Sequence, residues 1–168
     1  PTPTAGSVSS TNPSVCAGSD ATISFSGLLA TTPYTINYSR NNVPQSASVT
    51  TDASGIAVIT RLDAGNYSGF SITNANGCSS GVYNGTVGLS DPGSPAAPAN
   101  LTANPNPVCI GTMVNLSVTN NTSSVYTWSA TSGDAGLVTS STNSTRMLAT
   151  SPGSYTISVV QNIVGCTS

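Results

Sequence analysis

The chain has 168 residues and a mass of 16.6 kDa, with 37% hydrophobic and only 5% charged side chains; it has three Arg and five Asp, and no Lys, Glu or His. Three scattered Arg cannot neutralise the phosphates of a nucleic acid, and a chain without His lacks a common zinc ligand and the most frequent general base. No run of 18 apolar residues predicts a membrane span. We therefore expect no enzyme, no nucleic-acid partner and no membrane insertion. The high hydrophobic share and net charge of only −2 predict a folded chain.

Strands are predicted in both halves of the chain, because apolar and small polar residues alternate between clusters of Gly, Pro, Asn and Asp. No window predicts a helix. In the first half the expected strands cover residues 6–10, 21–27, 34–40, 45–51, 55–62, 66–73 and 81–89. In the second half they cover 99–104, 113–119, 124–130, 136–140, 144–149 and 154–162. Short strands at this spacing predict immunoglobulin-like β-sandwiches.

The two halves are copies of one module. Asn12-Pro13-Ser14-Val15-Cys16-Ala17-Gly18 matches Asn106-Pro107-Val108-Cys109-Ile110-Gly111, and Gly65-Asn66-Tyr67 matches Gly153-Ser154-Tyr155. In both copies the tyrosine precedes a cysteine by 11 residues. Self-similarity of this kind indicates tandem repeats.

The boundary between the copies is expected in the Pro-rich stretch 90–98, which reads as a short, semi-extended linker. The predicted modules are residues 1–90 and residues 91–168. The second copy ends two residues after its last cysteine and lacks the counterpart of strand 81–89. We expect either that the polypeptide continues or that a neighbouring subunit donates this strand by β-augmentation.

Tyr67 and Tyr155 each have the sequence context of a tyrosine corner, in which the phenol hydroxyl bonds to upstream backbone. Each lies at the start of the strand that corresponds to strand F of an immunoglobulin-like sandwich, 66–73 in the first copy and 154–162 in the second. The alternative is a tyrosine that is merely half-buried. A bulge at Ser68–Gly69 is expected, because Tyr67 is out of phase with Phe70 and Ile72.

Four cysteines allow three pairings, and the repeat favours one bridge inside each copy, Cys16–Cys78 and Cys109–Cys166. This pairing assumes that the strand after the first cysteine (21–27, strand B) and the strand before the second (66–73, strand F) run antiparallel in facing sheets. The start of one would then lie near the end of the other. Disulfides would place the chain outside the cell or on its surface. Reduced structural thiols are the alternative.

Two further groups are candidates for binding. Trp128, the only tryptophan, is expected in the sandwich core, with an exposed sugar-stacking platform formed with Tyr126 as the alternative. Asp91 could join Asp20 or Asp134 around Ca²⁺ at the module junction, although dispersed carboxylates argue against a tight site. A simple turn at Asp91-Pro92-Gly93 is the plainer interpretation. Eight Asn-x-Ser/Thr sequons give only weak support for glycosylation.

The first copy resembles the immunoglobulin-like repeats of giant Bacteroidota surface proteins, on Thr32-Pro33-Tyr34-Thr35-Ile36-Asn37-Tyr38, Asp52-Ala53-Ser54-Gly55, Asp63-Ala64-Gly65-Asn66-Tyr67 and Asn76-Gly77-Cys78. The second copy is similar to their PKD-like repeats, on Val108-Cys109-Ile110-Gly111, Tyr126-Thr127-Trp128 and Gly165-Cys166. These are the large adhesins, gliding-motility adhesins included, exported by the type IX secretion system. The resemblance implies tandem sandwiches in a long surface fibre or filament that attaches cells to surfaces, other cells or prey.

The expected function is therefore structural: a spacer or filament module of a secreted adhesin, whose partners are neighbouring repeats of the same polypeptide or identical subunits. The alternative is a carbohydrate-binding adhesive module that would contact surface glycans through Trp128. No cofactor is expected.

Overall fold

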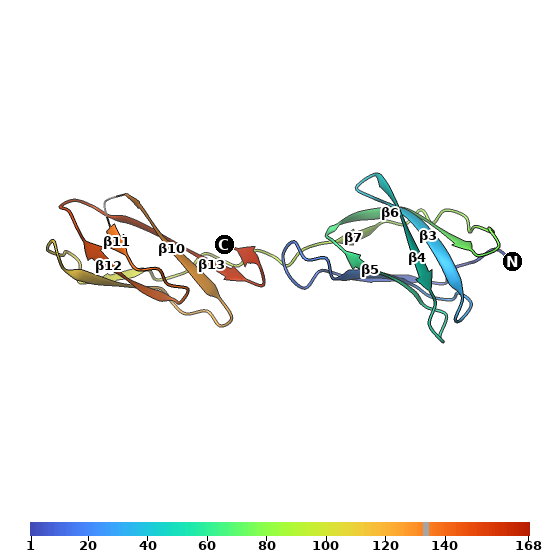
Figure 1. The fold of residues 1–168 in the computed structure, drawn as a ribbon, viewed down its shortest axis with the longest axis horizontal. Coiled ribbons are helices and arrows are strands. Elements are labelled where there is room, and N and C mark those ends of the chain that lie inside the picture. The colour runs from blue at the N-terminus through green and yellow to red at the C-terminus, as the bar shows by residue number, and fades with distance from the viewer. Residues whose placement is uncertain (133–134) are drawn as a thin grey trace. The chain divides into compact units, whose positions relative to one another are not determined.

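The computed structural model describes residues 1–132 and 135–168, and in those residues every regular element is a β-strand (Figure 1). The chain divides into two compact units, Pro1–Pro92 and Gly93–Ser168. Each unit is a sandwich of two antiparallel sheets. The described part of the chain holds no helix that is both long and apolar enough to cross a membrane.

The first unit packs a three-stranded sheet, in the order β1-β2-β5, on a four-stranded sheet, in the order β4-β3-β6-β7. Its strands are β1 (Val8–Thr11), β2 (Ala21–Phe25), β3 (Pro33–Arg40), β4 (Val43–Thr50), β5 (Ala57–Leu62), β6 (Gly65–Asn74) and β7 (Val87–Leu89). Alternate residues of β2 are buried, as period-2 patterning requires. Phe25 and Phe70 meet edge to face at the centre of the core, with ring centroids 5.3 Å apart.

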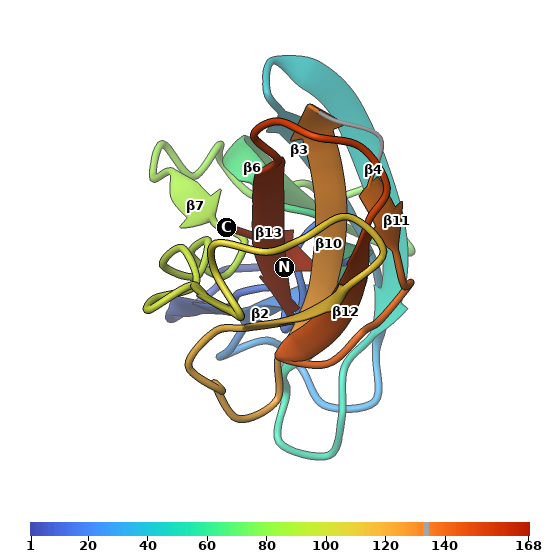
Figure 2. The same cartoon turned by 90° about the vertical axis from the view of Figure 1, so that its left-hand side faces the viewer.

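The second unit has the sheets β11-β12-β9-β8 and β10-β13-β14. Its strands are β8 (Thr102–Asn104), β9 (Met113–Ser117), β10 (Val125–Ser132), β11 (Ala135–Leu137), β12 (Ser144–Ala149), β13 (Thr156–Ile163) and β14 (Cys166–Thr167). Figure 2 shows β10 and β13 side by side, as their antiparallel register requires. The core is smaller than in the first unit and is built around Leu116, Tyr126, Trp128 and Met147.

A bulge is present in β6, one residue beyond the expected position Ser68–Gly69. Asn37 faces Ser71 and Ser39 faces Ser68, so the single residue Tyr38 on β3 lies opposite two residues of β6, Gly69 and Phe70. Gly69 has φ +66°, a conformation that glycine adopts without strain. The bulge turns both Tyr67 and Phe70 into the core, where each is 1% exposed.

The final strand differs between the units. In the first, β7 pairs with the start of β6, from Tyr67↔Val87 to Gly65↔Leu89. In the second, β14 has two residues and pairs only with Asn162 and Ile163, at the far end of β13. No described strand of the second unit takes the place of β7. The segment 81–89, expected as one strand, forms β7 and an isolated bridge from Tyr83 to Phe70.

Candidate functional site

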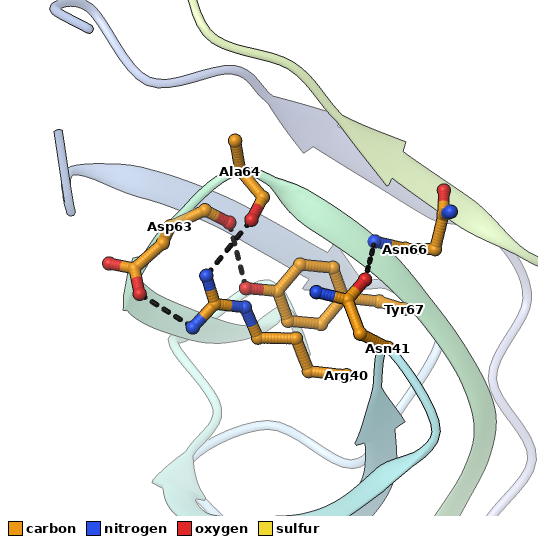
Figure 3. Close-up of polar contacts among 6 residues, drawn as sticks. All are labelled: Arg40, Asn41, Asp63, Ala64, Asn66 and Tyr67. Atoms are coloured by element: carbon orange, nitrogen blue, oxygen red, sulfur yellow. Dashed lines mark hydrogen bonds and ion pairs between the residues drawn. The ribbon is translucent and has the colours of Figure 1, made fainter. Parts of the chain in front are cut away.

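The start of β6 carries a polar cluster that fixes the turn between the two sheets of the first unit (Figure 3). The Tyr67 hydroxyl donates to the Asp63 carbonyl oxygen at 2.8 Å, which is the contact of a tyrosine corner. Arg40, at the end of β3, donates to the Asp63 carboxylate at 2.6 Å and to the Ala64 carbonyl at 2.9 Å. The cluster therefore ties β3 to the turn that joins β5 to β6.

A second contact extends this cluster to the β3–β4 turn. Asn41 and Asn66 form two hydrogen bonds there. The backbone N–H of Asn41 donates to the Asn66 carbonyl oxygen at 2.8 Å, and the backbone N–H of Asn66 donates to the Asn41 side-chain Oδ1 at 2.9 Å. Gly65 has φ +155°, and a Cβ there would lie 3.2 Å from Arg40 Nε. Burial raises the pKa of Tyr67. The cluster is a structural lock, since the Arg40–Asp63 pair uses both of its charges internally.

Among its described residues, the second unit has the tyrosine contact without an ion pair beside it. The Tyr155 hydroxyl donates to Ser151 O at 2.5 Å and accepts from Ser151 N at 2.9 Å. The hydrogen bond that the Ser151 backbone N–H donates to the phenol oxygen lowers the pKa of Tyr155, the reverse of the shift at Tyr67. Tyr155 is half-buried whereas Tyr67 is 1% exposed. The two equivalent tyrosines therefore sit in different surroundings.

The difference arises from the final strand. In the first unit Val87 and Leu89 of β7 pack onto the core beside Tyr67, and Leu89 is 4% exposed. In the second unit the equivalent space is an open groove of about 700 Å³. Its apolar lining includes Val108, Leu116, Met147, Tyr155 and Ile157. The groove lies beside the edge Ile157–Val160 of β13, which faces away from β10 and has no strand partner in the described residues.

Trp128 and Tyr126 do not form an exposed platform. Trp128 is 9% exposed and its Nε1 donates to Thr142 O at 2.9 Å. Tyr126 is 2% exposed and its hydroxyl accepts from Asn121 N at 2.7 Å. Both rings lie on the inward face of β10, in the core, so the sugar-stacking alternative is wrong for these two residues.

The expected bridges within each copy are also wrong. Cys78 and Cys109 are free thiols, whereas Cys16 and Cys166 are disulfide-bonded. The physical reason lies in strand direction. Because β2 pairs antiparallel with β5, and β6 turns back directly after β5, β6 runs parallel to β2.

A cysteine before β2 and one after β6 therefore lie at opposite ends of the module. Ten residues of β6 span about 33 Å, whereas a disulfide needs Cα atoms within about 7 Å. The second unit repeats this arrangement, with β9, β12 and β13 in the roles of β2, β5 and β6.

The carboxylates proposed for Ca²⁺ do not form a site in the described residues, where no group of three or more His, Cys, Asp or Glu side chains could hold a metal. Asp20 accepts hydrogen bonds from Ser14 N at 3.0 Å and Ser14 Oγ at 2.5 Å, which lower its pKa. Asp134 lies outside the described residues.

Comparisons with known proteins return structures only: no family profile and no curated protein matches the chain. Similar solved structures include a two-domain fibronectin type-III segment of chicken tenascin, at 16% identity and TM-score 0.36 over 100% of this chain and 95% of that one. The FN1-FN3 domains of chicken CNTN1 match at 14% identity and TM-score 0.39, over 99% of this chain and 62% of that one. A marsupial T cell receptor matches at 13% identity and TM-score 0.32, over 99% and 94%. The strand order described above makes the chain an all-β protein of two tandem immunoglobulin- or fibronectin type-III-like sandwich modules.

Proposed function

We propose that this chain is a non-enzymatic structural segment of a secreted cell-surface adhesin or extracellular filament, and that its second module is completed by a strand inserted into the groove beside β13. The inserted strand comes from the same polypeptide or from an identical subunit. Neighbouring modules are thus the partners of this chain. The difference between Tyr67 under β7 and Tyr155 beside an open groove carries the proposal.

The groove has the two features that β-augmentation uses. The edge of β13 offers main-chain hydrogen-bonding groups, and the lining offers apolar contacts to alternate side chains of an added strand. The first module shows which pattern fits, because Val87 and Leu89 face its core while Gly88 faces outward. An exposed edge of this kind is prone to pair with other strands.

A structural role agrees with the surface chemistry. Two residues are disulfide-bonded, which suits an oxidising compartment outside the cell. The polar cluster around Arg40 joins strand β3 to the β5–β6 turn, and its two charged groups, Arg40 and Asp63, are paired with each other. The resemblance of the sequence to Bacteroidota adhesins adds the finer expectation of export by type IX secretion and attachment to surfaces, cells or prey.

The strand proposal is tested by extension of the chain. Because Cys166 is equivalent to Cys78, the sequence of Gly81–Leu89 can follow Ser168 directly and continue β14 along the groove. We expect the extended chain to unfold its second module at a temperature several degrees higher, measured by the fluorescence of Trp128, the only tryptophan. The appended segment should also bury Tyr155 and raise its pKa.

The matched control is the same extension with aspartate in place of the residues that correspond to Val87 and Leu89. This control adds equal length but cannot enter an apolar groove. Equal melting temperatures for the two extended chains would contradict the proposal. The filament role is checked separately by electron microscopy of the natively purified parent assembly, where fibres are expected and isolated globules would refute it.

A further inference from the structure

The two free cysteines occupy positions that are disulfide-bonded in the other copy. Cys109 is the counterpart of Cys16, and Cys78 is the counterpart of Cys166. Cys16 and Cys166 are disulfide-bonded, whereas Cys78 and Cys109 are free. Cys109 is exposed and Cys78 is half-buried. The repeat thus supplies one bonded and one free example of each kind of cysteine.

In the first module each cysteine marks one end of the sandwich. Cys78 lies at the end where the chain begins, because its N–H donates to Asn74 Oδ1 at 3.0 Å and Asn74 Nδ2 donates to Pro1 O at 3.2 Å. Cys16 lies at the opposite end, with its Sγ 3.3 Å from the Pro92 carbonyl oxygen. We call these the proximal and the distal cysteine, after the ends at which the chain enters and leaves this module.

The second module has the same polarity. Cys166 is its proximal cysteine, because it pairs with Ile163 at the end of β13. Two residues earlier on the same strand, the Gln161 side chain donates to the carbonyl of Ala96 in the incoming segment. Cys109 is its distal cysteine, at the start of the loop that bonds to the end of β12 through Gly111 N and Ala149 O at 2.8 Å. The proximal and distal cysteines of one module cannot pair, because a whole sandwich separates them.

We propose that Cys78 and Cys109 are docking thiols, each of which forms a disulfide with the opposite kind of cysteine on an adjoining module. In a run of such modules the chain leaves each at its distal end and enters the next at its proximal end. Along the chain, the distal end of one module is therefore followed by the proximal end of the next module. The inference deepens the proposed structural role, and a second copy of this chain supplies the partner in the test below.

The chemistry is an oxidation and needs an electron acceptor. The two thiols lose two protons and two electrons as the S–S bond forms. With glutathione disulfide as the oxidant, a thiolate of the protein attacks it and releases glutathione. The second thiolate then attacks the mixed disulfide and releases the second glutathione. One glutathione disulfide is thus reduced to two thiols for each bond formed.

The test mixes two variants of the full chain in a glutathione redox buffer. Cys78→Ser keeps only the distal thiol Cys109, and Cys109→Ser keeps only the proximal thiol Cys78. Random pairing of equal amounts of the two variants would make half of all dimers mixed, with one molecule of each variant. We expect mixed dimers to make up clearly more than half of all dimers. The unaltered chain should form a ladder at multiples of 16.6 kDa on non-reducing gels.

The bond can be located after cleavage on the N-terminal side of Asp. Such cleavage places Cys78 in fragment 63–90 and Cys109 in fragment 91–133, apart from Cys16 in 1–19 and Cys166 in 134–168. A cross-linked pair of the fragments 63–90 and 91–133 supports the proposal. Dimers in random proportions, or thiols capped only by glutathione, would overturn it.

The double variant Cys78→Ser/Cys109→Ser separates this inference from the proposed function. It should keep the Trp128 melting transition and respond to the strand extension as the unaltered chain does. Absence of the mixed dimer of the single variants, together with a preserved response of the double variant to the extension, would count only against the thiols. A double variant with a normal melting transition also shows that the serine substitutions leave the fold intact.

Discussion

Replacement of Tyr67 by phenylalanine removes one hydrogen bond from the corner of the first module and leaves the ring in place. The hydroxyl donates to Asp63 O at 2.8 Å, and the residue is 1% exposed. A hydrogen bond of this kind contributes about 1 kcal/mol net, and an unsatisfied buried partner costs about 1–3 kcal/mol. Asp63 is half-buried, so water replaces part of the loss. We expect a decrease of about 1.5 kcal/mol in the free energy of unfolding of this module.

In a module of this size 1 kcal/mol corresponds to about 4–8 °C in melting temperature, so Tyr67→Phe should lower the midpoint by roughly 9 °C. Far-UV circular dichroism reports on both modules, whereas Trp128 fluorescence reports on the second alone. The substitution should lower the unfolding midpoint of the first module, seen by circular dichroism, and leave the midpoint seen by Trp128 fluorescence unchanged.

The matched variant is Tyr155→Phe, which removes the same hydroxyl from a half-buried site in the second module. Water can reach Ser151 there, so the expected loss is about 0.5 kcal/mol and appears in the Trp128 transition. Equal losses in the two variants, or a shift of the Trp128 midpoint by Tyr67→Phe, would refute the argument that β7 makes the difference.

Two further measurements test the placement of single residues. Trp128 should emit at short wavelength, resist quenching by acrylamide and ignore added glycans, since it is 9% exposed and its Nε1 is bonded to Thr142 O; emission typical of free tryptophan would contradict its place in the core. Hydrogen bonds from Ser14 hold the folded pKa of Asp20 below the ordinary carboxyl value of 3.8. Its stabilising contribution is therefore present above that value and is lost as pH falls through the lower folded pKa. Asp20→Asn should flatten the acid limb of stability against pH, and an unchanged acid limb would contradict the contact.

The sandwich fold could be predicted because its signals are local. Alternation along β2, the turn at Asp52 and the repeated cysteine and tyrosine motifs all depend on near neighbours. The presence of a bulge could also be predicted, since Tyr67 is out of phase with Phe70 and Ile72 and Gly69 lies between them. The inward position of Trp128 was the default expectation for a strand residue in a sandwich.

The cysteine partners could not be obtained in this way, because pairing depends on the direction of strands in opposite sheets. The prediction treated the strands on either side of the core as antiparallel. The connection from β5 to β6 makes β6 parallel to β2 and carries Cys78 to the far end. The Arg40–Asp63 contact was missed for a similar reason: it joins residues 23 positions apart, and only the approach of β3 to the β5–β6 turn reveals it.

The two sulfurs of the first module lie at opposite poles, so oxidation cannot join them to each other. Its two sheets are held together by noncovalent contacts, among them the packed rings of Phe25 and Phe70. A reductant therefore cuts no bond between these sheets, and the folding of this sandwich does not depend on the redox state of its surroundings.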